Sequence, residues 1–98
     1  RLTRLVRGSR SWQARRVAAR LLGTSDELSV VPALIFALSD NDKSVRAYAL
    51  DGLNFISRKF ESEIDIRNAS SEEIRVIQNK WTSWYQAMYP GYIDIGQN

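Results

Sequence analysis

The chain has 98 residues and a net charge of +3, enough for one small domain that buries about two-thirds of its unfolded surface. It contains no Cys and no His, which excludes disulfides and a Ser-His-Asp catalytic centre, and its longest apolar run, Val30 to Leu38, is too short for a membrane span of about 20 residues. The first 20 residues hold seven Arg and no acid, whereas the remainder holds seven Lys or Arg against eleven Asp or Glu, and this split favours an interaction face near the N-terminus.

The N-terminal 59 residues predict two helical hairpins that resemble each other. The stretch "ARRVAARLL" (14–22) aligns with "VRAYALDGL" (45–53), 31 positions later. Both copies carry an apolar residue, then Arg, then Ala at the fifth position and Leu at the ninth. Apolar residues four apart share one face of a helix, so each copy predicts a helix with one buried face.

Turn and cap residues separate the predicted helices. Gly23 is expected to end the helix of the first hairpin just beyond its last turn, with Thr24, Ser25 or Ser29 capping the next helix. Within the second hairpin, the short turn at 39–42 offers further capping residues.

The second helix of this hairpin is expected to start at a cap on Asn41 or Asp42 and to run to about Lys59. Residues 60–69 show neither helical nor strand periodicity. We interpret them as an ordered loop, and its apolar anchors would be Phe60, Ile64 and Ile66.

A final amphipathic helix is predicted after the loop. Ser70 and Glu73 have the spacing of a capping box. The apolar residues that follow keep to one helical stripe, namely Ile74, Ile77, Trp81, Trp84, Tyr85 and Met88. Because its neighbours are apolar, the aromatic cluster is interpreted as a core cap and not as a base-stacking platform. The sequence therefore predicts an all-α fold of five helices.

The segment "VVPALIFALSDNDKSVRAYALDGL" resembles a short HEAT-like repeat of the kind found in bacterial scaffolds and bilin (phycobilisome) lyases. The resemblance extends over residues 2–59 and implies an α-α superhelix closed by a C-terminal capping helix. The expected division of a single domain, 1–98, is a partial first repeat at 2–28, a second repeat at 29–59, a loop at 60–69, a capping helix at 70–89 and a tail at 90–98.

The resemblance also implies a structural ladder at the turns. In such repeats, an Arg near the start of the second helix pairs with a turn Asp of its own or the neighbouring repeat. Arg15 and Arg46 take that position here, and Asp40 or Asp42 would be the partner. The first turn has Ser9 where the second has an acid, so Arg15 must use Asp40 or Asp42 or remain unpaired.

A candidate partner surface is formed by the N-terminal arginines, and its members are Arg4, Arg7, Arg16 and Arg20. Such a set can bind an acidic protein or nucleic-acid phosphates, but it can also be an ordinary solvated surface. The turn at 40–51 lacks the Gly and Glu of a calcium loop, so no metal site is predicted there. No cofactor site or catalytic residue is predicted elsewhere, and the chain is not expected to be an enzyme.

The function predicted from these features is protein–protein interaction or scaffolding by a C-terminal segment of a longer HEAT-like solenoid. Nucleic-acid or acidic-partner binding through the Arg-rich first repeat is the alternative. An apolar N-terminal face is also expected, through which the chain would form a homodimer, and its residues would be Leu2, Leu5 and Val6.

Overall fold

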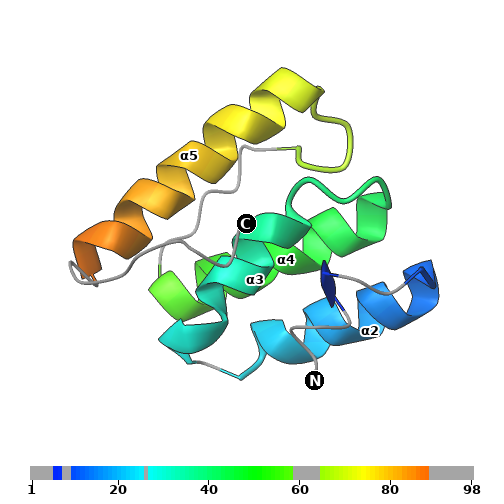
Figure 1. The fold of residues 1–98 in the computed structure, drawn as a ribbon, viewed down its shortest axis with the longest axis horizontal. Coiled ribbons are helices and arrows are strands. Elements are labelled where there is room, and N and C mark those ends of the chain that lie inside the picture. Colours follow the sequence, from blue (N-terminus) through cyan, green and yellow to red (C-terminus); the bar gives the residue numbers. More distant parts are fainter. Residues whose placement is uncertain (1–5, 8–9, 26, 59–64, 89–98) are drawn as a thin grey trace.

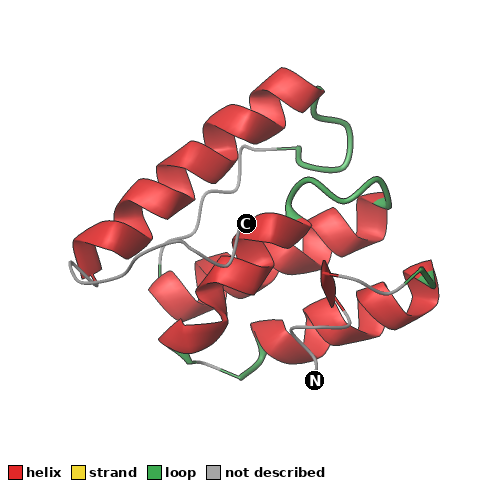
Figure 2. Cartoon of the chain, in the orientation of Figure 1, coloured by secondary structure: helices red, strands yellow, loops and turns green. Residues whose placement is uncertain are grey.

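The all-α class predicted from the sequence is confirmed by a computed structural model, which describes residues 6–7, 10–25, 27–58 and 65–88. The elements are α2 (Trp12–Gly23), the 3₁₀ helix η1 (Leu28–Val30), α3 (Val31–Ala37), α4 (Lys43–Ser57) and α5 (Ser71–Met88). Within these described ranges there is no strand (Figure 2). The predicted first helix falls largely outside them, although Val6 and Arg7 are helical. No helix among the described residues is both long enough and apolar enough to cross a membrane.

Within the described residues, the helices alternate between two layers and form a compact four-helix domain. Helix α2 packs along α4, α3 packs on α4, and α5 packs on α3 (Figure 1). Consecutive elements therefore change layer, with α2 and α4 in one layer and α3 and α5 in the other. The largest side chains that are fully buried come mainly from the two central helices and their caps; they are Leu34, Leu38, Leu53, Val6, Val31 and Val45.

The burial of Val6 corrects one expectation. Val6 is 1% exposed and belongs to the same buried cluster as the central helices, so it does not contribute to an exposed N-terminal face. Leu2 and Leu5, the other members of that expected face, lie outside the described residues.

Two glycines let α2 and α4 approach closely. A Cβ atom added to Gly52 would lie 2.6 Å from the Cα of Gly23, and one added to Gly23 would lie 2.9 Å from the Cα of Gly52. Both distances are shorter than any ordinary contact between carbon atoms. Ala18 and Ala49, which occupy equivalent positions of the two repeated segments, are also fully buried. Small side chains thus set the separation of this helix pair.

The end of α2 differs from the prediction. Gly23 is the last residue of the helix itself, and no described glycine has a positive φ, so close packing and not a left-handed cap explains its presence. The hydroxyls of Thr24 and Ser25 donate to the carbonyls of Leu21 and Leu22, at 2.9 and 2.8 Å. These two residues therefore satisfy the end of α2 instead of capping the next helix.

The boundaries of α4 follow from local chemistry. Of the two residues predicted as alternatives, Asn41 and Asp42, it is Asp42 that forms the N-cap, and its Oδ2 accepts from the backbone N–H of Val45 at 2.9 Å. The helix ends at Ser57, about two residues earlier than predicted, because Arg58 adopts a left-handed conformation with φ 62°.

Helix α5 begins with the predicted capping box. Glu73 Oε1 accepts from the backbone N–H of Ser70 at 2.8 Å, and Ser70 Oγ accepts from the backbone N–H of Glu73 at 3.1 Å. In the middle of the helix, Gln78 Nε2 donates to the carbonyl oxygen of Ile35 at 2.9 Å and ties α5 to α3.

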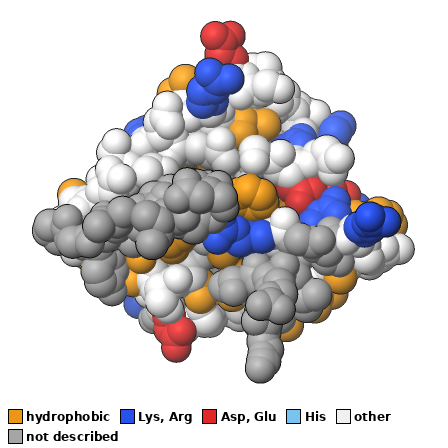
Figure 3. All heavy atoms as spheres, viewed as in Figure 1, with side chains coloured by type: hydrophobic (Ala, Val, Ile, Leu, Met, Phe, Trp, Pro, Cys, Tyr) orange, Lys and Arg blue, Asp and Glu red, His pale blue; other side chains and the backbone are white. Residues whose placement is uncertain are grey.

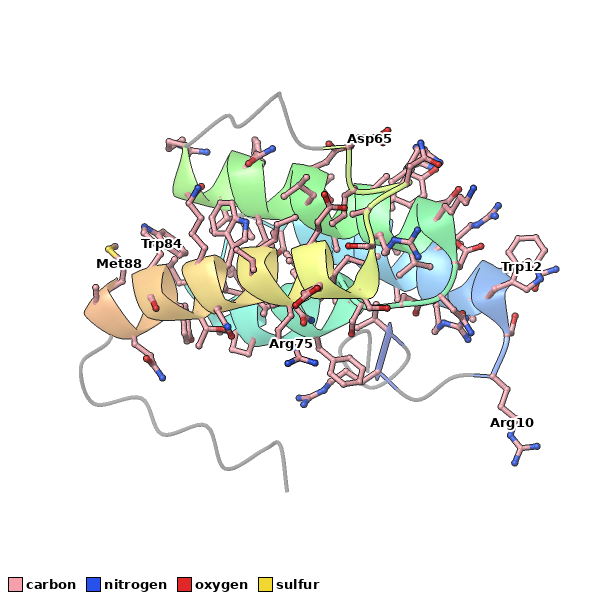
Figure 4. The ribbon with its side chains drawn as sticks, turned by 90° about the horizontal axis from the view of Figure 1, so that it is seen from above. Arg10, Trp12, Asp65, Arg75, Trp84 and Met88 are labelled. Atoms are coloured by element: carbon pink, nitrogen blue, oxygen red, sulfur yellow. The ribbon has the colours of Figure 1, made fainter. Side chains whose placement is uncertain are left out.

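The apolar stripe of α5 is buried over most of its length. The buried members are Ile74, Ile77, Trp81 and Tyr85, and Trp84 is half-buried. The rings of Trp81 and Trp84 meet edge to face with centroids 5.6 Å apart. Met88 was predicted to continue this stripe, but it is 52% exposed at the end of the helix (Figure 4).

Candidate interaction surface

The turn between α3 and α4 is held by two arginines from α2. Arg15 binds the carboxylate of Asp40 with both Nε (2.7 Å) and Nη2 (3.2 Å). Arg16 binds Asp42 in the same way, at 2.9 and 3.0 Å. Two-pronged pairs of this kind fix orientation as well as charge. They orient the turn relative to α2.

The same two carboxylates also organise the turn internally. Asp40 Oδ1 accepts from the backbone N–H of Asp42 at 2.9 Å, and Asp42 accepts from Val45 as the N-cap of α4. Each acid therefore satisfies a backbone donor and an arginine at once. The sequence predicted Asp40 or Asp42 as the partner of Arg15, and in the structure Arg15 pairs with Asp40.

Arg46 differs from the expected ladder because it binds backbone carbonyls. It is only 8% exposed and donates to the carbonyl oxygens of Asp40 (2.7 Å), Ile66 (2.9 Å) and Arg67 (2.6 Å). The carboxylates of the turn are already engaged by α2, and the side chain of Arg46 lies between the turn and the loop before α5. Arg46 thus joins three segments, and Ile66 is buried beside it as the predicted loop anchor.

The structure describes three of the four arginines proposed as a partner surface, and two of these three, Arg7 and Arg16, are engaged within the fold. Arg4 lies outside the described residues, and the Arg7 guanidinium stacks 5.0 Å from the ring centre of Phe36. Arg16 is paired with Asp42 and also stacks on Trp12 at 4.1 Å. Figure 3 accordingly shows acidic and basic side chains next to each other on the side of the molecule that it presents. Among the three described arginines, Arg20 is exposed and makes no ion pair with another described residue.

The Arg16–Asp42 pair predicts a dependence of stability on pH. The hydrogen bond from Arg16 lowers the pKa of Asp42 and raises the pKa of Arg16 itself. A carboxyl whose folded pKa is depressed stabilises the fold above its unfolded pKa of about 3.9, and this contribution is lost as the pH falls through the folded pKa.

We therefore expect Asp42→Asn to lower the free energy of unfolding by about 1 kcal/mol at pH 7, because an exposed ion pair is worth about that much and Asn still caps the helix. The difference from the wild type should shrink below about pH 4. Urea unfolding between pH 2.5 and 7 measures both effects. Glu27→Gln, at an exposed acid whose side chain has no partner in the described region, is the control and should show no such convergence.

A groove between α2 and α4 was not anticipated from the sequence. Its volume is about 280 Å³, and its floor is the crossing of Gly23 and Gly52. Tyr48 and Phe55 form apolar walls, and Arg20 and Asp51 lie at its rim. The heptad-like spacing of Tyr48, Asp51 and Phe55 signals one exposed face of α4, but only the position of α2 turns that face into a groove.

A second groove of similar volume lies beside the Arg15–Asp40 pair, and it is lined by Val6, Arg7, Phe36 and Asn41 as well. Apart from these grooves, exposed apolar side chains gather on α2, where Trp12, Val17 and Leu21 are 44%, 56% and 47% exposed. Trp12 projects outward at the start of the helix (Figure 4). The described residues contain no group of acidic side chains able to hold a metal ion.

Comparisons with protein-family models, with curated proteins and with solved structures found no match to this chain.

Proposed function

We propose that the chain is a protein-interaction module of the HEAT-like α-solenoid type, closed at one end by α5. The alternation of helices supports this reading. In a stack of helical hairpins, the first helices of successive units form one layer and the second helices form the other. Helices α3 and α5 contact each other as the first helices of successive units do, and α2 and α4 contact each other as the second helices do. In this proposal α5 takes the place of the first helix of a further unit.

The observation that carries the proposal is the apolar surface of α2. Val17 and Leu21 lie one helical turn apart on a side of α2 that is not buried against α4, and about half of each side chain is exposed. Covering the exposed part of each of these two side chains would stabilise an assembly by roughly 1 kcal/mol per side chain. We infer that another helical hairpin packs on this side of α2.

Nucleic-acid binding is less well supported by the same geometry. Phosphate binding requires several cations that are free to replace counterions. Arg15 and Arg16 are each neutralised by an aspartate of the α3–α4 turn. Helix α2 has one further arginine, Arg20, but exposes three large apolar side chains, which favours a protein surface as the partner.

The stacking proposal can be tested by appending a designed helical hairpin ahead of residue 1. If α2 receives such a hairpin, the extended chain should unfold in one transition with a free energy of unfolding about 2 kcal/mol or more above that of the chain alone. Val17→Lys combined with Leu21→Lys should abolish this gain. The matched control is Val76→Lys on α5, which is 63% exposed and should leave the gain intact. Independent unfolding of the added hairpin would rule the proposal out.

A further inference from the structure

The groove between α2 and α4 has two charged side chains of opposite sign at its rim. Arg20 belongs to α2 and Asp51 to α4, and both are exposed. Neither makes an ion pair or a hydrogen bond in the described part of the chain, although they border the same groove. A surface that carries one cation, one anion and an apolar centre is electrically complementary to a copy of itself.

We propose that two copies of this chain associate through this groove about a two-fold axis. In such an interface a residue of one copy contacts a second residue of its partner, and the reverse contact is made as well. Arg20 of each copy would then pair with Asp51 of the other. Two ion pairs form from four charges that have no partner within the described chain.

Phe55 supplies the apolar part of the contact. Its ring is 42% exposed at the edge of the groove, whose floor carries no side chains because it is made by Gly23 and Gly52. A space of about 280 Å³ accepts an aromatic side chain but is below the usual range for a drug-sized ligand. The Phe55 ring of each copy can therefore enter the groove of the other.

The groove is lined by aromatic and arginine side chains of the kind that are common at protein interfaces. Arg20 of α2 lines the groove together with Tyr48 and Phe55 of α4. Tryptophan, tyrosine and arginine are the side chains that most often dominate binding energy at protein interfaces. This surface does not include Val17 or Leu21, so the inference does not depend on the stacking proposal.

The test uses two single charge reversals and their mixture, followed by sedimentation velocity. In Arg20→Glu, both inter-copy pairs become acid against acid, and in Asp51→Arg both become base against base. Each variant alone should self-associate at least tenfold more weakly than the wild type. In a mixture of the two, the introduced glutamate at position 20 faces the introduced arginine at position 51, and the native Arg20 faces the native Asp51. The mixture should therefore form a heterodimer with near wild-type affinity.

The matched controls are Arg10→Glu and Glu72→Arg, which make the same changes of net charge at exposed positions away from the groove. Both should dimerise like the wild type. Circular dichroism of each variant checks that the helices are retained, as expected for exposed residues without partners. A wild-type chain that stays monomeric up to millimolar concentration, or a mixture no more associated than its components, would overturn the proposal while leaving the stacking test unaffected.

Discussion

Replacing Arg46 with methionine is expected to lower the free energy of unfolding by about 3 kcal/mol, a large part of the 5–15 kcal/mol typical of a domain. The guanidinium donates to three backbone carbonyls, of Asp40, Ile66 and Arg67. Each of these carbonyls would lose a charged donor, and a hydrogen bond of this kind contributes about 1.5–3 kcal/mol. Methionine removes the cost of burying a charge and keeps the packing of the alkyl chain, so the net loss is smaller than the sum of three bonds.

Equilibrium urea unfolding measures this loss. Arg75→Met is the matched control, because Arg75 is exposed and has no partner in the described region, and its effect should stay within about 0.5 kcal/mol. Arg46→Lys should recover less than half of the loss, since a single ammonium group cannot reproduce the planar fork of donors. Equal stability of the methionine variant and the wild type would show that the three bonds contribute nothing.

Amide hydrogen exchange distinguishes a local effect from a general one. Arg46 joins α4 to residues 66 and 67 of the loop before α5 through two hydrogen bonds to backbone carbonyls. The methionine variant should therefore lose protection in the loop and in the first turn of α5 before it loses protection in the pair of helices α2 and α4. Uniform loss of protection would indicate that the arginine acts only through global stability.

The features that the sequence predicted correctly depend on residues close together in the chain. The capping box of Ser70 and Glu73 needs only a spacing of three, and the N-cap at Asp42 needs only its own turn. The buried faces of the two repeated segments follow from helical periodicity, and Ala18, Ala49 and Leu53 are all fully buried as that periodicity predicted.

The features that were missed depend on how separate helices meet. Arg15 and Arg16 are neighbours in sequence, and the sequence alone does not determine that one pairs with Asp40 and the other with Asp42. That choice is set by the rotation of α2 relative to the α3–α4 turn. For this reason the sequence pattern placed Arg16 on a partner surface, whereas in the structure it forms an ion pair with Asp42.

Arg46 shows the same limit for a loop. Its ligands at residues 66 and 67 lie in a segment without periodicity, so no pattern associates them with an arginine 20 residues earlier. Gly23 shows the same limit of local prediction at the end of a helix. Read locally, a glycine before Thr-Ser is a helix terminator, and only the approach of Gly52 reveals that the absence of a side chain is what matters.

The crossing of these glycines gives the second large effect. Gly52→Ala places a Cβ 2.6 Å from the Cα of Gly23 and 3.1 Å from Cδ1 of Leu34. The first neighbour is backbone, which cannot rotate away, so α2 and α4 must move apart. Overpacking of this kind costs about 3 kcal/mol, whereas alanine regains about 1 kcal/mol of helix propensity over glycine. We expect a net loss of about 2 kcal/mol in the free energy of unfolding.

Lys43→Ala provides the control for helix propensity, since Lys43 is exposed on the same helix and has no partner in the described region. Its effect on the urea unfolding midpoint should be small and of either sign. Gly23→Ala should destabilise less than Gly52→Ala, because its added Cβ meets backbone at 2.9 Å and not at 2.6 Å. The double variant decides the mechanism. Both changes push the same two helices apart, so together they should cost less than the sum of the two single losses. Strict additivity, or a Gly52→Ala variant as stable as the wild type, would mean that the two helices do not depend on this contact for their separation.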